Sequence, residues 1–229
     1  MIKNIIFDWS GVLSNDFTLV YNGVMYIFRK LGLRTLSVEE FKREFSLPYM
    51  GFYEKFTTAP KEEIDRLFLQ AIHLLEGPKP FPGAKELLEF LSGKQIRLAI
   101  LSSNPQEKLE EEVKDYGFQE FFINIKGSVH DKTEEISKLM ERNGFLAQET
   151  AYVGDMIHDI EAGKKAKVTT IAISWGGYQT YQTKEELRAE KPDFLIDDLS
   201  KIKKIVSCAT QKGSLFYFCQ KLPKLTKRN

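Results

Sequence analysis

With 229 residues, 42% of them hydrophobic and 28% charged, the chain has the composition of a globular protein and the length of one core domain with an insertion. Its two cysteines, Cys208 and Cys219, are too few for a disulfide framework, and no cluster of His and Cys indicates a zinc site. No signal peptide is visible, and no uncharged stretch reaches the roughly 18 apolar residues of a membrane span. We therefore expect a cytoplasmic protein without a membrane-spanning helix.

Six short apolar segments recur along the chain and predict buried strands. They are IIF (5–7), IRLAIL (96–101), FFINI (121–125), TAYVG (150–154), VTTIAI (168–173) and DFLI (193–196). Segments with helical spacing of apolar residues lie between them, at 83–93, 105–117, 132–144 and 157–167. Alternating strands and helices of this kind predict an α/β fold, a doubly wound parallel sheet with helices on both faces.

Residues 17–79 interrupt this alternation. The segment is rich in aromatic residues and helical patterns, and it ends at EGPKPFPG, whose prolines indicate a linker. We therefore expect a core domain made of residues 1–16 and 80–205 and an inserted helical cap domain at 17–79. A basic C-terminal tail follows at 206–229.

The charge of the chain is unevenly distributed. The formal net charge is +1, but residues 199–229 hold eight Lys or Arg and no acid, so residues 1–198 carry 25 basic and 32 acidic side chains, a net of −7. We interpret the basic tail as a solvated end. Nucleic acid is not the expected partner, although the tail leaves that question open. The sequence gives no indication of the oligomeric state.

Charged and hydroxyl side chains follow the first four predicted strands. These residues are Asp8, Ser102, Ser103, Lys132, Asp155 and Asp159. Because ligands of open parallel sheets bind beyond the carboxyl ends of the strands, we expect these side chains to meet at one edge of the sheet. The sequence therefore predicts a single polar site there.

The chemistry of this set favours phosphoryl transfer. A carboxylate such as Asp8 can attack phosphorus and form an aspartyl-phosphate, which divides one difficult step into two. Asp8 and Asp155 together provide the oxygen ligands that suit Mg²⁺. Ser102 and the backbone amides behind it can bind phosphate oxygens, and Lys132 supplies a positive charge to the phosphate.

Four motifs in this order, IIFDWSGVL, LAILSS, DKTEE and YVGDMIHD, resemble those of the haloacid dehalogenase (HAD) superfamily of phosphohydrolases. The resemblance covers about residues 1–16 and 80–200. FPGAKELLEFL, AISWGGYQTYQTKEEL and an insertion after the first motif are similar to the phosphoglycolate-phosphatase branch, whose core is Rossmann-like and whose cap is helical. The resemblance implies an Mg²⁺-dependent phosphatase of a small phosphorylated metabolite.

The resemblance also implies a role for each site residue. Asp8 is expected to be the nucleophile and a metal ligand, and Lys132 the catalytic, phosphate-binding lysine. The remaining expected roles are phosphate binding by Ser102 and Ser103, and metal binding by Asp155, Asp159 and the backbone carbonyl of Ser10. Ser10 is also expected to be a catalytic residue, because it occupies the position of the family's acid.

Ser10 departs from the family pattern. Most phosphatases of the superfamily carry a second Asp at this position, which protonates the leaving oxygen and then activates water. A hydroxyl cannot act as acid or base near pH 7 as a carboxylate does, and losing such catalysis costs about 10²–10⁴-fold. We therefore expect a slow or leaving-group-selective phosphatase that favours substrates such as acyl phosphates. Asp16 is a hypothetical source of the absent carboxylate.

Two alternatives remain open at this stage. The segment DWSGV also resembles DWAGT of phosphonoacetaldehyde hydrolase, which cleaves a C–P bond through a Schiff base on a cap lysine. The cap lysines considered for that role are Lys30, Lys42, Lys55 and Lys61. The other alternative is a catalytically silent protein that binds phosphate or a partner. Retention of Asp8, Lys132 and Asp155 favours an enzyme.

Overall fold

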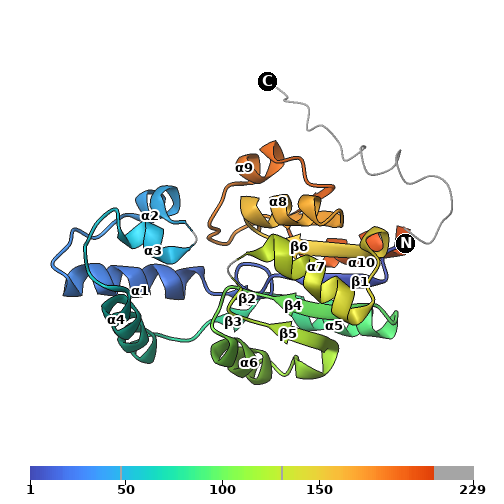
Figure 1. The fold of residues 1–229 in the computed structure, drawn as a ribbon, viewed down its shortest axis with the longest axis horizontal. Coiled ribbons are helices and arrows are strands. Elements are labelled where there is room, and N and C mark those ends of the chain that lie inside the picture. Colours follow the sequence, from blue (N-terminus) through green and yellow to red (C-terminus); the bar gives the residue numbers. More distant parts are fainter. Residues whose placement is uncertain (47, 130, 209–229) are drawn as a thin grey trace.

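The computed structural model describes residues 1–46, 48–129 and 131–208. Its centre is a six-stranded sheet in the order β5-β4-β1-β6-β7-β8, and every neighbouring pair is parallel (Figure 1). The strands are β1 (Asn4–Phe7), β4 (Arg97–Leu101), β5 (Phe122–Lys126), β6 (Thr150–Gly154), β7 (Thr169–Ile173) and β8 (Phe194–Ile196). The chain adds β4 and β5 on one side of β1 and then β6, β7 and β8 on the other side, which makes the sheet doubly wound. The predicted fold class is therefore confirmed.

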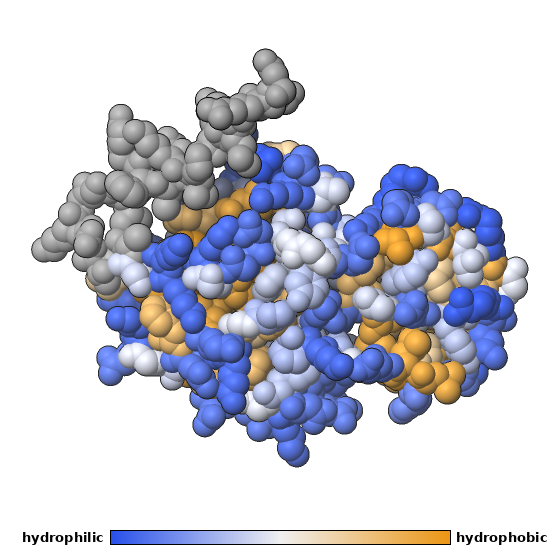
Figure 2. Space-filling view, turned by 180° about the vertical axis from the view of Figure 1, so that it is seen from behind, coloured by the Kyte–Doolittle hydropathy of each residue, from blue (hydrophilic) through white to orange (hydrophobic). Residues whose placement is uncertain are grey.

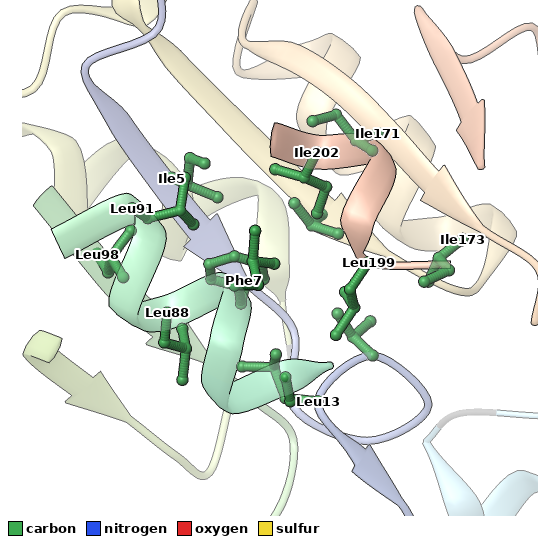
Figure 3. Close-up of a cluster of buried hydrophobic side chains, with 14 of the residues drawn as sticks. Ile5, Phe7, Leu13, Leu88, Leu91, Leu98, Ile171, Ile173, Leu199 and Ile202 are labelled. Atoms are coloured by element: carbon green, nitrogen blue, oxygen red, sulfur yellow. The ribbon is translucent and has the colours of Figure 1, made fainter. Parts of the chain in front are cut away.

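Helices cover both faces of the sheet because successive strand side chains point to opposite sides. Ile5 and Phe7 lie in one hydrophobic cluster and Ile6 in the other. Figure 3 shows the first cluster, which α5 (Ala84–Gly93), α6 (Gln106–Asp115) and α10 (Ser200–Cys208) close. The opposite face is covered by α7 (Lys132–Asn143), α8 (Ile157–Lys165) and α9 (Lys184–Ala189).

The segment between β2 and β3 forms a helical lobe beside the sheet (Figures 1 and 2). It comprises α1 (Phe17–Lys30), α2 (Val38–Glu44), α3 (Tyr49–Tyr53) and α4 (Lys61–Leu74). Ser37 and Glu40 begin α2 with a reciprocal capping box. The helices of the lobe pack around an aromatic cluster that is separate from the clusters of the sheet.

The loop between β7 and α9 joins the cap to the core. Tyr181 of this loop is buried in the aromatic cluster of the cap, with its ring stacked on Phe45 at 5.3 Å and edge-on to Phe17 at 5.1 Å between centroids. Lys42 of α2 donates a hydrogen bond of 2.8 Å to the side chain of Gln179 in the same loop. These contacts hold the cap over the edge of the sheet that carries the predicted site.

A two-stranded antiparallel ladder marks both crossings between core and cap. It pairs β2 (Ser14–Asn15) with β3 (Lys79–Pro80), and β3 lies inside the segment that the sequence indicates as a linker. Strands of two residues carry no periodic pattern, which is why the sequence does not predict them. Two 3₁₀ turns, η1 (Gln119–Phe121) and η2 (Ala147–Glu149), precede β5 and β6.

The end of the core differs slightly from the expected boundary at residue 205. Helix α10 continues to Cys208, so the first three residues assigned to the basic tail belong to a helix. The rest of the tail, including Cys219, lies outside the described residues. Within the part of the chain that the structure describes, every helix is too short or too polar to cross a membrane.

Candidate active site

An ion-paired lysine lies at the carboxyl end of the sheet. Lys132, the first residue of α7, donates hydrogen bonds of 2.7 Å to Oδ2 of Asp8, which follows β1, and to Oδ1 of Asp159 in α8. All three side chains are buried, with relative exposures of 6%, 5% and 1%. The structure therefore brings together three predicted site residues that lie far apart in the sequence.

The position of Lys132 is electrostatically unusual. A cation in the first turn of a helix faces the positive end of the helix dipole, and burial disfavours its charge further. Burial acts to lower the pKa of Lys132, but Asp159 and Asp8 outweigh it and hold this pKa well above its ordinary value. The two carboxylates therefore keep Lys132 charged inside the protein.

The same ion pairs divide the carboxyl groups into two kinds. Burial acts to raise the pKa of Asp159, but Lys132 and His158 outweigh it, so this pKa lies below its ordinary value. Burial raises the pKa of Asp8, and Lys132 opposes only part of that effect. Burial followed by repulsion from Asp159 and Asp8 raises the pKa of Asp155 well above its ordinary value. One lysine is thus too little positive charge for this cluster.

The carboxylates fit a hard divalent cation. Asp8, Asp155 and Asp159 each offer one oxygen, and these atoms lie within 4.8 Å of one another. Oδ2 of Asp155 is buried and has no hydrogen-bond partner among the described residues. Oxygen-only donors, excess negative charge and an unpartnered carboxylate oxygen suit a hard divalent cation such as Mg²⁺.

Gly11 makes room for this cluster. Its φ of +70° is a conformation that side chains other than glycine rarely adopt, and a Cβ atom there would lie 2.0 Å from Oδ2 of Asp155. The indole of Trp175 donates a hydrogen bond of 2.9 Å to the Gly11 carbonyl. Trp9 fixes the start of the same loop, because its indole donates to Oε2 of Glu112 at 2.7 Å. The loop that follows Asp8 is therefore held from both sides.

The serines after β4 lie at the same edge of the sheet. Ser102 is buried, and its hydroxyl oxygen accepts a hydrogen bond of 3.2 Å from the backbone N–H of Asn104. Its hydroxyl proton is thus left to donate to a ligand. Ser103 follows and is half-buried. Ser10, also half-buried, donates a hydrogen bond of 3.3 Å to the side-chain oxygen of Asn104, which connects the loops after β1 and β4.

Two further groups border the site. Asp16 is buried at the start of α1, and burial raises its pKa to about 7, with the Ser10 hydroxyl opposing that shift. Tyr152 of β6 donates a hydrogen bond of 3.3 Å to Oδ1 of Asp159. The sequence offers no signal for Tyr152, because an inward-facing tyrosine in a strand looks like any other core residue.

Comparison with known proteins identifies the family. A family model of haloacid dehalogenase-like hydrolases matches residues 5–173, most of the chain. The chain belongs to this family. It is therefore an enzyme, a HAD-superfamily phosphohydrolase, and both predictions from the motifs are confirmed.

Individual relatives match over nearly their whole length. The chain is 26% identical over 218 residues to "Pyrophosphatase PpaX" of Bacillus cereus strain AH820, covering 90% of this chain and 97% of that protein. The fold is similar to a haloacid dehalogenase-like hydrolase from Streptococcus pneumoniae, with a TM-score of 0.77, 19% identity and coverages of 90% and 98%. It is equally similar to a predicted phosphoglycolate phosphatase from Haemophilus somnus, with a TM-score of 0.77, 20% identity and the same coverages.

Proposed function

We propose that the protein is an Mg²⁺-dependent phosphatase that acts on a small phosphorylated metabolite through an aspartyl-phosphate on Asp8. The observation that carries this proposal is the buried arrangement of Asp8 and Asp159 around Lys132, with Asp155 beside them and one of its oxygens unpartnered. A fold that only needed a stable core would gain little from so many buried charges. A nucleophilic carboxylate beside a cation is what phosphoryl transfer requires.

Each side chain has a part in the proposed reaction. A carboxylate oxygen of Asp8 attacks phosphorus, and the bond from phosphorus to the leaving oxygen breaks. Lys132 offsets the charge of the phosphate and keeps Asp8 oriented, since it already hydrogen-bonds Oδ2. The hydroxyl of Ser102, with Ser103, would donate to phosphate oxygens. Water then attacks phosphorus and releases phosphate, which regenerates Asp8.

Mg²⁺ would be held by Asp8, Asp155, Asp159 and the backbone carbonyl of Ser10. When bound, it supplies positive charge to the phosphate oxygens and lowers the repulsion between phosphate and carboxylates.

Ser10 and the named relatives suggest which substrates to test first. Without a carboxylate at position 10, the rate of hydrolysis should fall least for substrates whose leaving group departs with little need of a proton. Acyl phosphates and pyrophosphate are of that kind, and the Bacillus relatives are named pyrophosphatases. We therefore expect acetyl phosphate and pyrophosphate to be hydrolysed faster than alkyl phosphates.

The phosphonate alternative gains no support from the cap. Lys30, Lys55 and Lys61 are exposed, and the half-buried Lys42 donates a hydrogen bond to Gln179. Lys55 donates to the Glu44 backbone carbonyl at 2.8 Å and Lys61 pairs with Asp65, so both are engaged within the cap. A Schiff-base lysine needs a lowered pKa and a place against the substrate, which favours a buried position.

Removal of the metal tests the proposal. Phosphate release from acetyl phosphate, pyrophosphate and p-nitrophenyl phosphate should fall at least about 100-fold in EDTA, because the cation supplies several kcal/mol of charge stabilisation. Excess Mg²⁺ added back should restore the rate. Equal rates in EDTA and in Mg²⁺ would contradict the proposed metal dependence.

A further inference from the structure

The loop between β7 and α9, residues 174–183, is anchored in both the core and the cap. At its start, the backbone N–H of Ser174 donates to the carbonyl of Ile196 in β8 at 2.9 Å, and Trp175 is buried in the first hydrophobic cluster of the core. Near its end, Tyr181 is buried in the aromatic cluster of the cap. Loops usually run over the surface, so two buried aromatic anchors in one loop call for an explanation.

Trp175 holds both chain crossings between core and cap. Its indole N–H donates to the carbonyl of Gly11, in the loop that leads from Asp8 to the cap, at 2.9 Å. Its ring stacks on Phe81 of the return crossing, with centroids 4.0 Å apart and an interplanar angle of 9°. The backbone N–H of Phe81 in turn donates to the carbonyl of Leu13 at 2.9 Å. One side chain thus fixes the two crossings relative to each other.

The carbonyl that Trp175 binds belongs to a residue packed against the site. A Cβ atom on Gly11 would lie 2.0 Å from Oδ2 of Asp155, so the backbone there lies close to that carboxyl. Gly11 also follows Asp8 by only three residues. A displacement of Gly11 would therefore disturb both acids, and a misplacement of reacting groups by about 1 Å can cost roughly 100-fold in rate.

Tyr181 is the anchor in the cap, and its ring makes the contacts. The ring stacks on Phe45 and lies edge-on to Phe17, whereas the hydroxyl makes no hydrogen bond to any residue that the structure describes. Met156, the neighbour of Asp155, packs against the same cluster. The cap therefore rests on core residues that lie beside the site, and the packing of the Tyr181 ring is part of that contact.

Few residues separate the two anchors. Gly177, with a φ of +82°, turns the chain in the left-handed region that suits glycine. Tyr178 then packs edge-on against Trp175 and Phe81, at 5.9 and 5.3 Å between centroids. Tyr181 lies three residues further on, and three residues span at most about 10 Å. A movement of Tyr181 with the cap would therefore pull on the aromatic stack around Trp175.

We propose that this loop couples the position of the cap to the position of the loop after Asp8. This inference rests on the proposed function. Tyr181 and Trp175 are positioning residues, because the first acts through the cap and the second through Gly11. The two crossings pair in one short ladder, β2 with β3, which restrains the cap at one end only. The loop of residues 174–183 is the second restraint, so the reactive geometry is complete when the cap lies over the site.

A double-mutant cycle on kcat tests this coupling. Trp175→Phe keeps a ring on Phe81 but removes the hydrogen bond to Gly11, so kcat for acetyl phosphate and for p-nitrophenyl phosphate should fall about 10–100-fold with little change in KM. Tyr181→Leu fills most of the buried space without the ring contacts and should lower kcat while raising KM. The two rings are not in contact, so independent effects on kcat would multiply.

Coupling predicts a different result for the double variant. Because both substitutions release the same loop, Trp175→Phe combined with Tyr181→Leu should lose little more kcat than the more damaging single variant, as for residues that act as a unit. Losses that multiply, or single variants with the kcat of the wild type, would overturn the proposal.

Two further variants separate coupling from a general weakening of the cap. Tyr181→Phe keeps the ring and should restore both kcat and KM to nearly wild-type values. Phe56→Ala is a matched control, since Phe56 packs in the same cluster against Phe28 and Phe52, at 5.1 and 5.3 Å, and makes no ring contact with the loop. It should leave kcat nearly unchanged and show no coupling to Trp175→Phe. Equal coupling of Phe56→Ala would overturn the proposal.

The wild-type enzyme separates this inference from the proposed function. Urea denaturation of every variant first establishes the conditions in which each is folded, and the rates are measured there. Turnover that requires Mg²⁺ and Asp8, together with losses that multiply in the cycle, would overturn the coupling alone. A wild-type protein that releases no phosphate from either substrate in Mg²⁺ would overturn both.

Discussion

Lys132→Met should destabilise the protein by about 3–5 kcal/mol and also abolish most of its activity. The substitution retains the length of the side chain but removes the charge that faces Asp8 and Asp159, leaving both carboxylates buried without a counter-charge. Removal of one donor that stabilises developing charge costs a further 10²–10³-fold in kcat, roughly, in the protein that still folds. Urea denaturation in EDTA measures the first effect, and phosphate release in Mg²⁺ the second.

The loss of stability should depend on pH. The pKa of Asp159 lies below its ordinary value in the folded protein, so its pairing with Lys132 stabilises at neutral pH, and that contribution is lost as the pH falls through the lowered pKa. In Lys132→Met the lysine no longer opposes burial, so the pKa values of Asp8 and Asp159 should be higher than in the wild type. Protonation of these carboxyl groups as the pH falls then restores part of the variant's stability. The difference in unfolding free energy should therefore narrow as the pH falls from 7 toward 4.

Lys138→Met is a matched control on the same helix. Lys138 is half-exposed and pairs with Glu134 and Glu135 at 2.8 and 3.0 Å, and surface pairs of this kind contribute about 0.3–0.5 kcal/mol each. A Lys132→Met protein as stable as Lys138→Met at neutral pH would contradict the assignment of a buried ion-paired cluster.

Asp8→Asn should lower kcat by roughly 10⁶-fold, the scale seen when a covalent nucleophile is removed, while the protein stays folded. Asn retains one oxygen, which can accept either from the Trp9 backbone N–H or from Lys132, and Lys132 also keeps its hydrogen bond to Asp159. The pKa of Asp8 is raised by burial, which means that its charged form costs stability in the folded protein compared with the unfolded chain. Replacing it with a neutral side chain should therefore leave the metal-free protein at least as stable as the wild type.

Thermal denaturation in EDTA and phosphate release in Mg²⁺ separate these two expectations. Asp131→Asn serves as the control, since Asp131 caps α7 by accepting hydrogen bonds from Thr133 and Glu134, and Asn is an equally good cap. Substantial phosphatase activity in Asp8→Asn would contradict the assignment of Asp8 as the nucleophile.

The positions of the charged site residues could be predicted from the sequence because one topological rule places them. Asp8 and Asp155 directly follow apolar strands, and the carboxyl ends of parallel strands share an edge. The order of the four motifs then placed Lys132 at the same edge. The sheet and its winding followed from the alternation of strand and helix patterns, and the helical insertion from its helical patterns and the prolines that end it.

The long-range side-chain contacts around the site could not be predicted from the sequence. The bond from Ser10 to Asn104 joins residues 94 positions apart, and that from Trp9 to Glu112 spans 103. Insertion of Tyr181 into the cap cluster is likewise a long-range contact. Such pairs depend on how loops from different strands approach each other. Neither hydrophobic periodicity nor a local sequence motif predicts the distance between two such loops.

Mass spectrometry of the enzyme quenched in acid during turnover of acetyl phosphate in Mg²⁺ tests the central proposal most directly. Acid preserves an acyl phosphate long enough to digest the protein and locate the phosphoryl group. The proposal predicts one added phosphoryl group on the peptide that contains Asp8, and none in Asp8→Asn. A phosphoryl group on another residue, or none during demonstrable turnover, would contradict the aspartyl-phosphate mechanism.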